Sequence, residues 1–195
     1  MTAVKWFKDL FFSNKNNKEE KSVSISQKYP NLNLILDNKG FDFIKNWEKY
    51  EGKAYRCPAG KMTIGFGHVI LPDDVIAEGF VTYHAAEELL RKDIVKRSHW
   101  IGLNILKPLT QGQYNALVSL AFNSTSDGDL SRVAPAAMTF LNLGDYTNAA
   151  EQLFSKEHGL VNITAKDKTT GERKTTKCQG LVNRRQAEWD MWDGK

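Results

Sequence analysis

Helical periodicity recurs along most of the chain, and two short stretches interrupt it. Residues 53–70 are rich in Gly, Tyr, Thr and Ile around the turn "PAGK", which predicts a short hairpin or small sheet. Residues 163–177 alternate threonine with charged residues around a glycine, which predicts an exposed hairpin. Apolar residues return at helical spacing in the segments 38–51, 84–94, 109–122, 135–154 and 181–192. Many helices around one small strand region predict an α+β fold, with a small β lobe packed on a larger helical lobe and a cleft between them.

Cap residues indicate where several of these helices begin and end. Asn38 and Gly52 are expected to start and stop the first one. The segment "LTQGQYNALVSLAF" begins with a capping box from Thr110 to Gln113, and its apolar stripe makes it the expected core helix. Gly144 is expected to divide the segment 135–154 into two helices.

The length of the chain predicts one folded domain with an N-terminal extension. A chain of 195 residues with 41% hydrophobic residues can bury one sizeable core. We expect the domain to span residues 31–195 and the extension to span residues 1–30. Within the extension, residues 3–12 predict a short amphipathic helix that docks on the domain, binds a protein partner or lies on a membrane, and a polar linker follows it.

Charge and composition argue against several classes of protein. The net charge of +4 is mild, and the sequence has no dense basic stripe, zinc-ligand spacing or phosphate-binding loop, so we expect no nucleic-acid partner and no metal site. No segment approaches the roughly 18 apolar residues that span a bilayer. Charged residues interrupt the N-terminal segment, so we expect synthesis in the cytoplasm without a cleavable signal peptide.

Glu48 is the strongest candidate for a catalytic acid. On a helical wheel it falls between Phe41 and Ile44, on the apolar face of the first helix. Desolvation disfavours the charged form of a carboxyl group and raises its pKa, as a general acid requires. Alternatively, Glu48 turns out to water or pairs with an arginine at the helix end, and Glu51 is a rival acid.

Cys57 and Thr63 flank the predicted turn at fixed distances from Glu48. Eight residues separate Glu48 from Cys57, and five separate Cys57 from Thr63. If the hairpin folds back at this turn, the thiol and the hydroxyl come from neighbouring strands and face the helix end. An acid on one side and a pair that holds water on the other suit hydrolysis of a glycosidic bond.

The sequence resembles the phage-type lysozymes, glycoside hydrolase family 24, over roughly residues 38–193. The signature of this family is a glutamate, eight residues, an aspartate or cysteine, five residues and a threonine within "TIGxGH"; Glu48, Cys57 and Thr63 in "TIGFGH" match it. The lambdoid branch also has segments like "PLTQGQYNALVSLAFN", "LNLGDYTNAA" and "GLVNRRQAE", which occur here in that order.

The resemblance implies an inverting muramidase that hydrolyses the bond between N-acetylmuramic acid and N-acetylglucosamine in peptidoglycan. It implies that Glu48 is the acid, that position 57 and Thr63 handle the water, and that neither a metal nor an organic cofactor is needed. We also expect the protein to be a monomer. The substrate-binding residues that the resemblance suggests are Arg184, packed against Glu48, together with Asn123 and Val69 in the cleft; Phe122 either joins them or belongs to the core.

The two cysteines and one histidine leave alternatives open. A thiol at its ordinary pKa of about 8.5 is mostly neutral at pH 7. Either Thr63 positions more of the water, or Cys57 is a thiolate, or its sulfur attacks the sugar and gives retained stereochemistry. A disulfide between Cys57 and Cys178 would block the site. We expect His68 to be a structural residue that bonds to the helical lobe.

Three segments depart from a bare lambdoid lysozyme: residues 1–30, "KDKTTGERKTTK" and "STSDGDLSRVAPAA". The expected setting is the bacterial cell wall, which the protein reaches as an endolysin released through a membrane pore or as an effector injected by a secretion machine. Two other functions are a lysozyme-like module that binds peptidoglycan or a protein without cutting, and a transglycosylase that forms an anhydro sugar without water.

Overall fold

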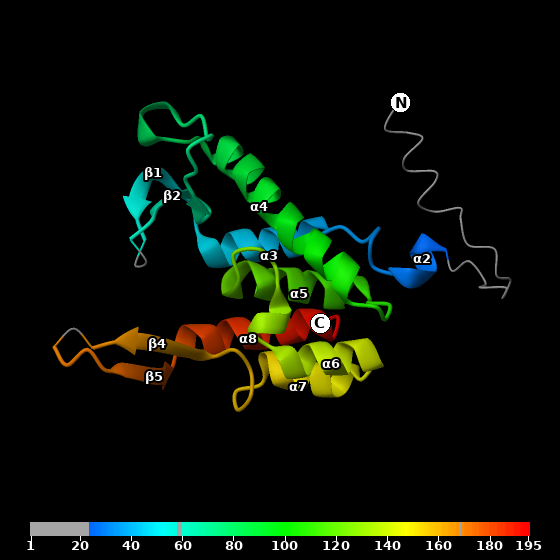
Figure 1. Ribbon diagram of the computed structural model, residues 1–195. Coiled ribbons are helices and arrows are strands. Elements are labelled where there is room, and N and C mark those ends of the chain that lie inside the picture. The colour runs from blue at the N-terminus through cyan, green and yellow to red at the C-terminus, as the bar shows by residue number, and fades with distance from the viewer. Residues whose placement is uncertain (1–23, 58–59, 168) are drawn as a thin grey trace, which may run out of the picture.

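The computed structural model describes residues 24–57, 60–167 and 169–195 (Figure 1). The helix expected within residues 3–12 lies outside these ranges. None of the described helices is both long enough and apolar enough to cross a membrane. The described elements, in chain order, are α2 (Ile25–Lys28), α3 (Asn38–Glu48), β1 (Glu51–Arg56), β2 (Met62–Gly65), β3 (His68–Val69), η1 (Ala77–Gly79), α4 (Tyr83–Asn104), α5 (Gln111–Ser124), η2 (Leu130–Arg132), α6 (Pro135–Leu143), α7 (Tyr146–Phe154), β4 (Asn162–Lys166), β5 (Arg173–Lys177) and α8 (Gln179–Trp192). The predicted α+β class is confirmed.

Helix α5 is the centre of the helical lobe. The predicted capping box is present, because the Thr110 hydroxyl accepts from the backbone of Gln113 while the Gln113 side chain accepts from the backbone of Thr110. Every residue from 114 to 121 is buried, rather than the single stripe that the sequence predicts. The reason is that α3, α4 and α8 all pack around it. A helix that is enclosed on all sides has no polar face to show.

Two predicted helix ends are wrong. Asp37 caps α3, where its carboxylate accepts a 2.9 Å hydrogen bond from Gly40 N, and the helix ends at Glu48 rather than near Gly52. Lys49 has a φ of 57° and turns the chain into β1, which contains Gly52. Helix α4 continues ten residues beyond the predicted segment, to Asn104, because its C-terminal part packs against the chain near Asn31.

A three-stranded antiparallel sheet forms the β lobe, in the order β1-β2-β3. Aromatic side chains join it to the start of α4: the ring of Phe66 lies 5.8 Å from Tyr50 and 5.4 Å from Tyr83. The Tyr50 hydroxyl also donates a 2.6 Å hydrogen bond to Val81 O. These contacts hold the sheet against the helical body at the end of α3.

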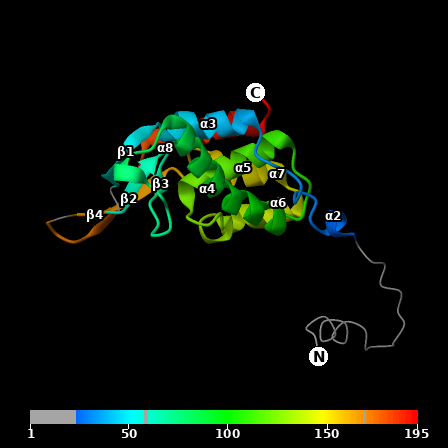
Figure 2. The same ribbon diagram turned by 90° about the horizontal axis from the view of Figure 1, so that it is seen from above.

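The second predicted hairpin is β4 and β5, which pair antiparallel from Asn162–Lys177 to Lys166–Arg173. The sheet and this hairpin protrude on the same side of the helical body in both views (Figures 1 and 2). The predicted division at Gly144 is also confirmed, since Gly144 has a φ of 80° between α6 and α7.

His68 joins the sheet to the helical lobe, as expected. Its Nδ1 lies 2.8 Å from an oxygen of Asp93 on α4, and its Nε2 lies 2.9 Å from an oxygen of Asp74. Ionised carboxylates only accept, so the two contacts favour the doubly protonated ring. Hydrogen bonding to Asp93 raises the pKa of His68, and hydrogen bonding to His68 lowers the pKa of Asp74.

We expect this contact to make stability depend on pH. The contribution of His68 to the free energy of unfolding is complete below the pKa of about 6.5 that this residue has in the unfolded chain. It is lost as the pH rises through the raised pKa of His68 in the folded protein. The contribution of Asp74 is complete above its unfolded pKa of about 3.9 and is lost as the pH falls through its lowered folded pKa. His68→Gln should therefore lower the free energy of unfolding by on the order of 2 kcal/mol between about pH 4 and 6.5, and by less above that range.

Urea unfolding at a series of pH values measures this difference. His84→Gln, at an exposed position on α4, is the matched control and should change stability little at any pH. A loss for His68→Gln that stays constant from pH 5 to pH 9 would contradict the assignment.

Candidate active site

Glu48 lies at the junction of the two lobes because it is the last residue of α3. Its Oε1 accepts a 2.7 Å hydrogen bond from a terminal guanidinium nitrogen of Arg184 on α8, and its side chain is 20% exposed. A Cβ added to Gly67, in the turn after β2, would lie 3.6 Å from Oε2 of Glu48. One carboxylate oxygen is therefore held by the helical lobe, and the other faces the sheet.

The neighbours of Glu48 are only partly those that the helical wheel predicts. Phe41 and Ile44 are buried on the same face of α3, as expected. The carboxylate itself pairs with a cation, because α8 passes the end of α3 at this point. The predicted contact between Arg184 and Glu48 is confirmed. The rival acid Glu51 is exposed on β1, and its carboxylate accepts a 3.3 Å hydrogen bond from Lys53 N.

Arg184 is held in turn by buried groups. Its Nε donates to Glu188 Oε1 at 3.2 Å, and Ser119 donates to the same oxygen at 2.7 Å. Arg185 completes the network, with its Nε 2.6 Å from Glu188 Oε2 and a terminal nitrogen 2.9 Å from Asn123 Oδ1. Glu188 is fully buried. Two carboxylates and two guanidiniums thus alternate from Glu48 to Arg185, and the network fixes the position of the Arg184 guanidinium.

Burial disfavours the charged forms of two groups in this network. Desolvation raises the pKa of Glu188, although the charges of Arg185 and Arg184 act in the opposite direction. Desolvation also lowers the pKa of Arg185. Sequence reasoning missed Glu188, Arg185 and Ser119. The available signal was that Glu188 follows Arg184 by four residues and Arg185 by three, so all three share one face of α8.

The strand register places Cys57 and Thr63 on one face of the β1–β2 hairpin. Tyr55 pairs with Thr63, and Cys57 N donates to Lys61 O at 2.9 Å. Paired residues point to the same side and the sides alternate along a strand, so the side chains of Tyr55, Cys57 and Thr63 share a face. Thr63 is buried, and its hydroxyl donates to Lys61 O at 3.2 Å.

The disulfide between Cys57 and Cys178 is absent. Cys178 is a free thiol that lies at the start of α8, before the first helical residue. The two cysteines are on different elements, Cys57 after β1 and Cys178 after β5. The structure therefore shows the site without this disulfide, and a bond that blocks the site under oxidising conditions stays a hypothesis.

Tyr55 is a site neighbour that sequence reasoning missed. Its side chain is 40% exposed and lies directly across from Thr63. Burial raises the pKa of Tyr55, and electrostatic interactions with Cys57, Glu48 and Glu51 act in the same direction. The phenol thus lies in the electrostatic field of the two groups that the motif spacing singled out. Its place two residues before Cys57 was the available signal.

The other predicted substrate-binding residues lie in different surroundings. Val69 is partly exposed on β3 and pairs with Thr63. Asn123 contacts Arg185 and lines a cavity of about 560 Å³ between the end of α5 and the base of the β4–β5 hairpin. Phe122 packs against the core, with the Arg97 guanidinium 4.5 Å from its ring centre, which agrees with the alternative that it is a core residue.

Known proteins share this fold and sequence pattern. The family described as Phage lysozyme matches residues 45–188. The chain belongs to the phage lysozyme family. An endolysin of Acyrthosiphon pisum secondary endosymbiont phage 1 is 35% identical over 160 residues, which cover 82% of this chain and 99% of that relative.

Solved structures agree with this assignment. The endolysin from Escherichia coli O157:H7 phage FAHEc1 is similar with a TM-score of 0.68 and 28% identity, over 82% of this lysozyme and 94% of that chain. The muramidase domain of SpmX from Asticaccaulis excentricus is similar with a TM-score of 0.65 and 25% identity, over 81% of this chain and 97% of that domain. The lysozyme is thus a glycoside hydrolase of the muramidase type. Within the described ranges, no cluster of three or more His, Cys, Asp or Glu side chains could hold a metal ion.

Proposed function

We propose that this lysozyme hydrolyses the bond between N-acetylmuramic acid and N-acetylglucosamine with inversion, using Glu48 as the general acid. The observation that carries the proposal is that the two carboxylate oxygens of Glu48 have different neighbours. Arg184 occupies Oε1, which leaves Oε2 on the side of the sheet. A proton on Oε2 would be delivered to the leaving oxygen of a glycan that lies between Glu48 and the hairpin.

The proposed water site is on the hairpin face that carries Thr63, Cys57 and Tyr55. The Thr63 hydroxyl donates to Lys61 O, so its oxygen keeps lone pairs that can accept from a water. Cys57 lies on the same face, two residues after Tyr55, and its sulfur supplies a second hydrogen-bond acceptor for the water. Water held there attacks the anomeric carbon from the face opposite Glu48 and releases its extra proton to solvent, while the leaving oxygen departs on the other side with the proton from Glu48.

The stereochemistry of the product tests this proposal. Inversion of a β bond by water gives the α anomer first, with a reducing end on every fragment. Proton NMR of the first turnovers and mass spectrometry of the fragments make this measurement. The β anomer would instead indicate a covalent intermediate on Cys57, and anhydro ends would indicate a transglycosylase. Wall binding with no fragments released would indicate a binding module.

We also propose that the catalytic domain begins at Asn31 and acts as a monomer on the bacterial cell wall, as an endolysin does. The side-chain nitrogen of the buried Asn31 donates to Ile105 O at 2.7 Å and to Lys107 O at 2.9 Å. Its side-chain oxygen accepts from Leu109 N at 2.9 Å. These bonds support Asn31 as the first residue tied into the helical lobe. Residues 1–30 would then be an extension that serves delivery or a partner.

A further inference from the structure

The β4–β5 hairpin carries most of the net charge of the chain. The segment 162–177 contains five basic and two acidic residues, which gives a formal charge of +3 out of +4 for the whole chain. The basic residues are Lys166, Lys168, Arg173, Lys174 and Lys177. The positive charge is therefore concentrated on the surface of the β4–β5 hairpin rather than spread evenly over the protein.

Among the described side chains of the hairpin, the acidic residues form no ion pair with a basic residue. The Asp167 carboxylate accepts 2.8 Å hydrogen bonds from the backbone nitrogens of Thr169 and Thr170, so it serves the turn, and these bonds lower its pKa. All residues of β5 are exposed. Among the described residues, no ion pair or side-chain hydrogen bond is formed by Arg173, Lys174 or Lys177.

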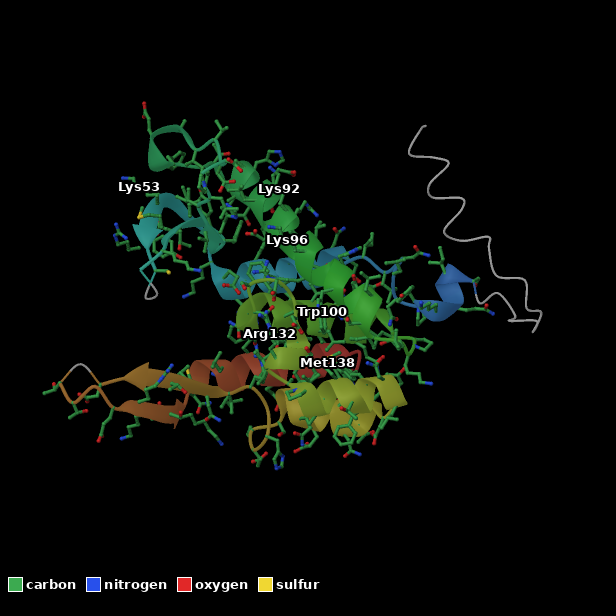
Figure 3. All side chains as sticks on the ribbon, in the orientation of Figure 1. Lys53, Lys92, Lys96, Trp100, Arg132 and Met138 are labelled. Carbon is green, nitrogen blue, oxygen red and sulfur yellow. The ribbon has the colours of Figure 1, made fainter. Side chains whose placement is uncertain are left out.

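The hairpin is a ribbon that contributes little to the core. Its two strands are held by backbone pairing and by a 2.8 Å contact between the hydroxyls of Thr164 and Thr175. Residues 173, 175 and 177 point to one face and Lys174 to the other, so basic side chains line both faces. Figure 3 shows side chains of the ribbon extending away from the helical body.

The base of the ribbon lies next to the network of charged residues that runs from Glu48 to Arg185. Asn162 and Ile163 of β4 line the same 560 Å³ cavity as Asn123. Asn123 accepts from Arg185, which is linked through Glu188 and Arg184 to Glu48. The ribbon and the sheet protrude on the same side of the molecule (Figures 1 and 2). A polymer bound at Glu48 would therefore have the ribbon beside it.

We propose that the β4–β5 ribbon binds the carboxylates of the stem peptides of peptidoglycan. This inference rests on the proposed function. The glycan strand is itself uncharged, because the muramic acid carboxyl is consumed in the amide bond to the peptide. The free carboxylates lie on the stem peptides, which project sideways from the strand near the cleaved bond. They are the anionic groups of the substrate that a basic ribbon next to the site can reach.

Binding to strands with and without stem peptides tests the proposal. The parent protein is the full chain with Glu48→Gln, so that the strands are not cut during the titration. The test variant adds Arg173→Gln, Lys174→Gln and Lys177→Gln. The probes are soluble glycan strands of one length, free of attached anionic polymers, either carrying their stem peptides or stripped of them. We expect the triple change to raise the Kd for peptide-bearing strands about tenfold at low salt, and to leave the Kd for stripped strands unchanged.

A matched control removes the same charge elsewhere. Lys92 and Lys96 lie on α4 (Figure 3), and Lys107 is exposed in the loop after it. Changing these three to Gln should leave both Kd values unchanged. The proposal is overturned if the hairpin variant weakens both strands equally, if it weakens neither, or if the control weakens binding as much. A failure of the proposed function shows separately, as a wild-type chain that releases no fragments.

Discussion

We expect Glu48→Gln to lower kcat about 10²- to 10⁴-fold, because glutamine cannot donate the proton that the proposed mechanism gives to the leaving oxygen. The amide keeps the shape of the side chain and an oxygen that can accept from Arg184, so the fold and substrate binding should change little. Loss of turbidity of a cell-wall suspension measures the rate, and circular dichroism with a melting curve verifies the fold.

Glu51→Gln is the control for this experiment. Glu51 is only three residues away, but it is exposed on β1 and has no cationic partner among the described side chains. Its replacement should leave kcat within about twofold, in keeping with a group that takes no part in the proton transfer. If Glu51→Gln abolished the activity, or Glu48→Gln retained more than a tenth of it, another group would be the acid.

Glu188→Gln should be the most destabilising single change in the network of charged residues that runs from Glu48 to Arg185. It removes the negative charge between Arg184 and Arg185, and both guanidiniums are buried. Removing one partner of a buried ion pair costs about 3–5 kcal/mol, since the other charge is left uncompensated. For a chain of this length, that loss corresponds to a fall in Tm of about 10 °C. Urea unfolding and thermal melting measure both quantities.

Activity distinguishes positioning from simple stabilisation in this variant. Below the melting range, kcat of Glu188→Gln should fall more than KM rises, because Arg184 no longer holds the Glu48 carboxylate in place. Glu157→Gln, which alters an exposed acid that forms no ion pair or side-chain hydrogen bond with the described residues, should change stability by less than about 0.5 kcal/mol. A loss below 1 kcal/mol for Glu188→Gln would show that the network is not required for stability.

Local patterns in the sequence predicted most of the fold. The capping box at Thr110, the break at Gly144 and the alternation in residues 163–177 each describe backbone geometry over a few residues, and each is confirmed. The errors occurred where contacts from elsewhere decide the outcome. Helix α4 extends through Gly102 because residues 31 and 32 approach its backbone there, with Asn31 O 3.2 Å from where a Cβ would be.

The candidate site also has a part that local sequence predicts and a part that only tertiary packing decides. The sequence by itself determined which residues are the candidates for the chemistry: the spacing of Glu48, Cys57 and Thr63 predicts a helix end followed by a tight hairpin, and such spacing is local. Only the tertiary structure decided what surrounds them. Arg184 reaches Glu48 across 136 positions of the chain, and Glu188, Arg185 and Ser119 join it because α8 packs along α5. Helical and strand periodicity fix which face a side chain occupies, whereas the packing of distant elements fixes which other side chains it meets there.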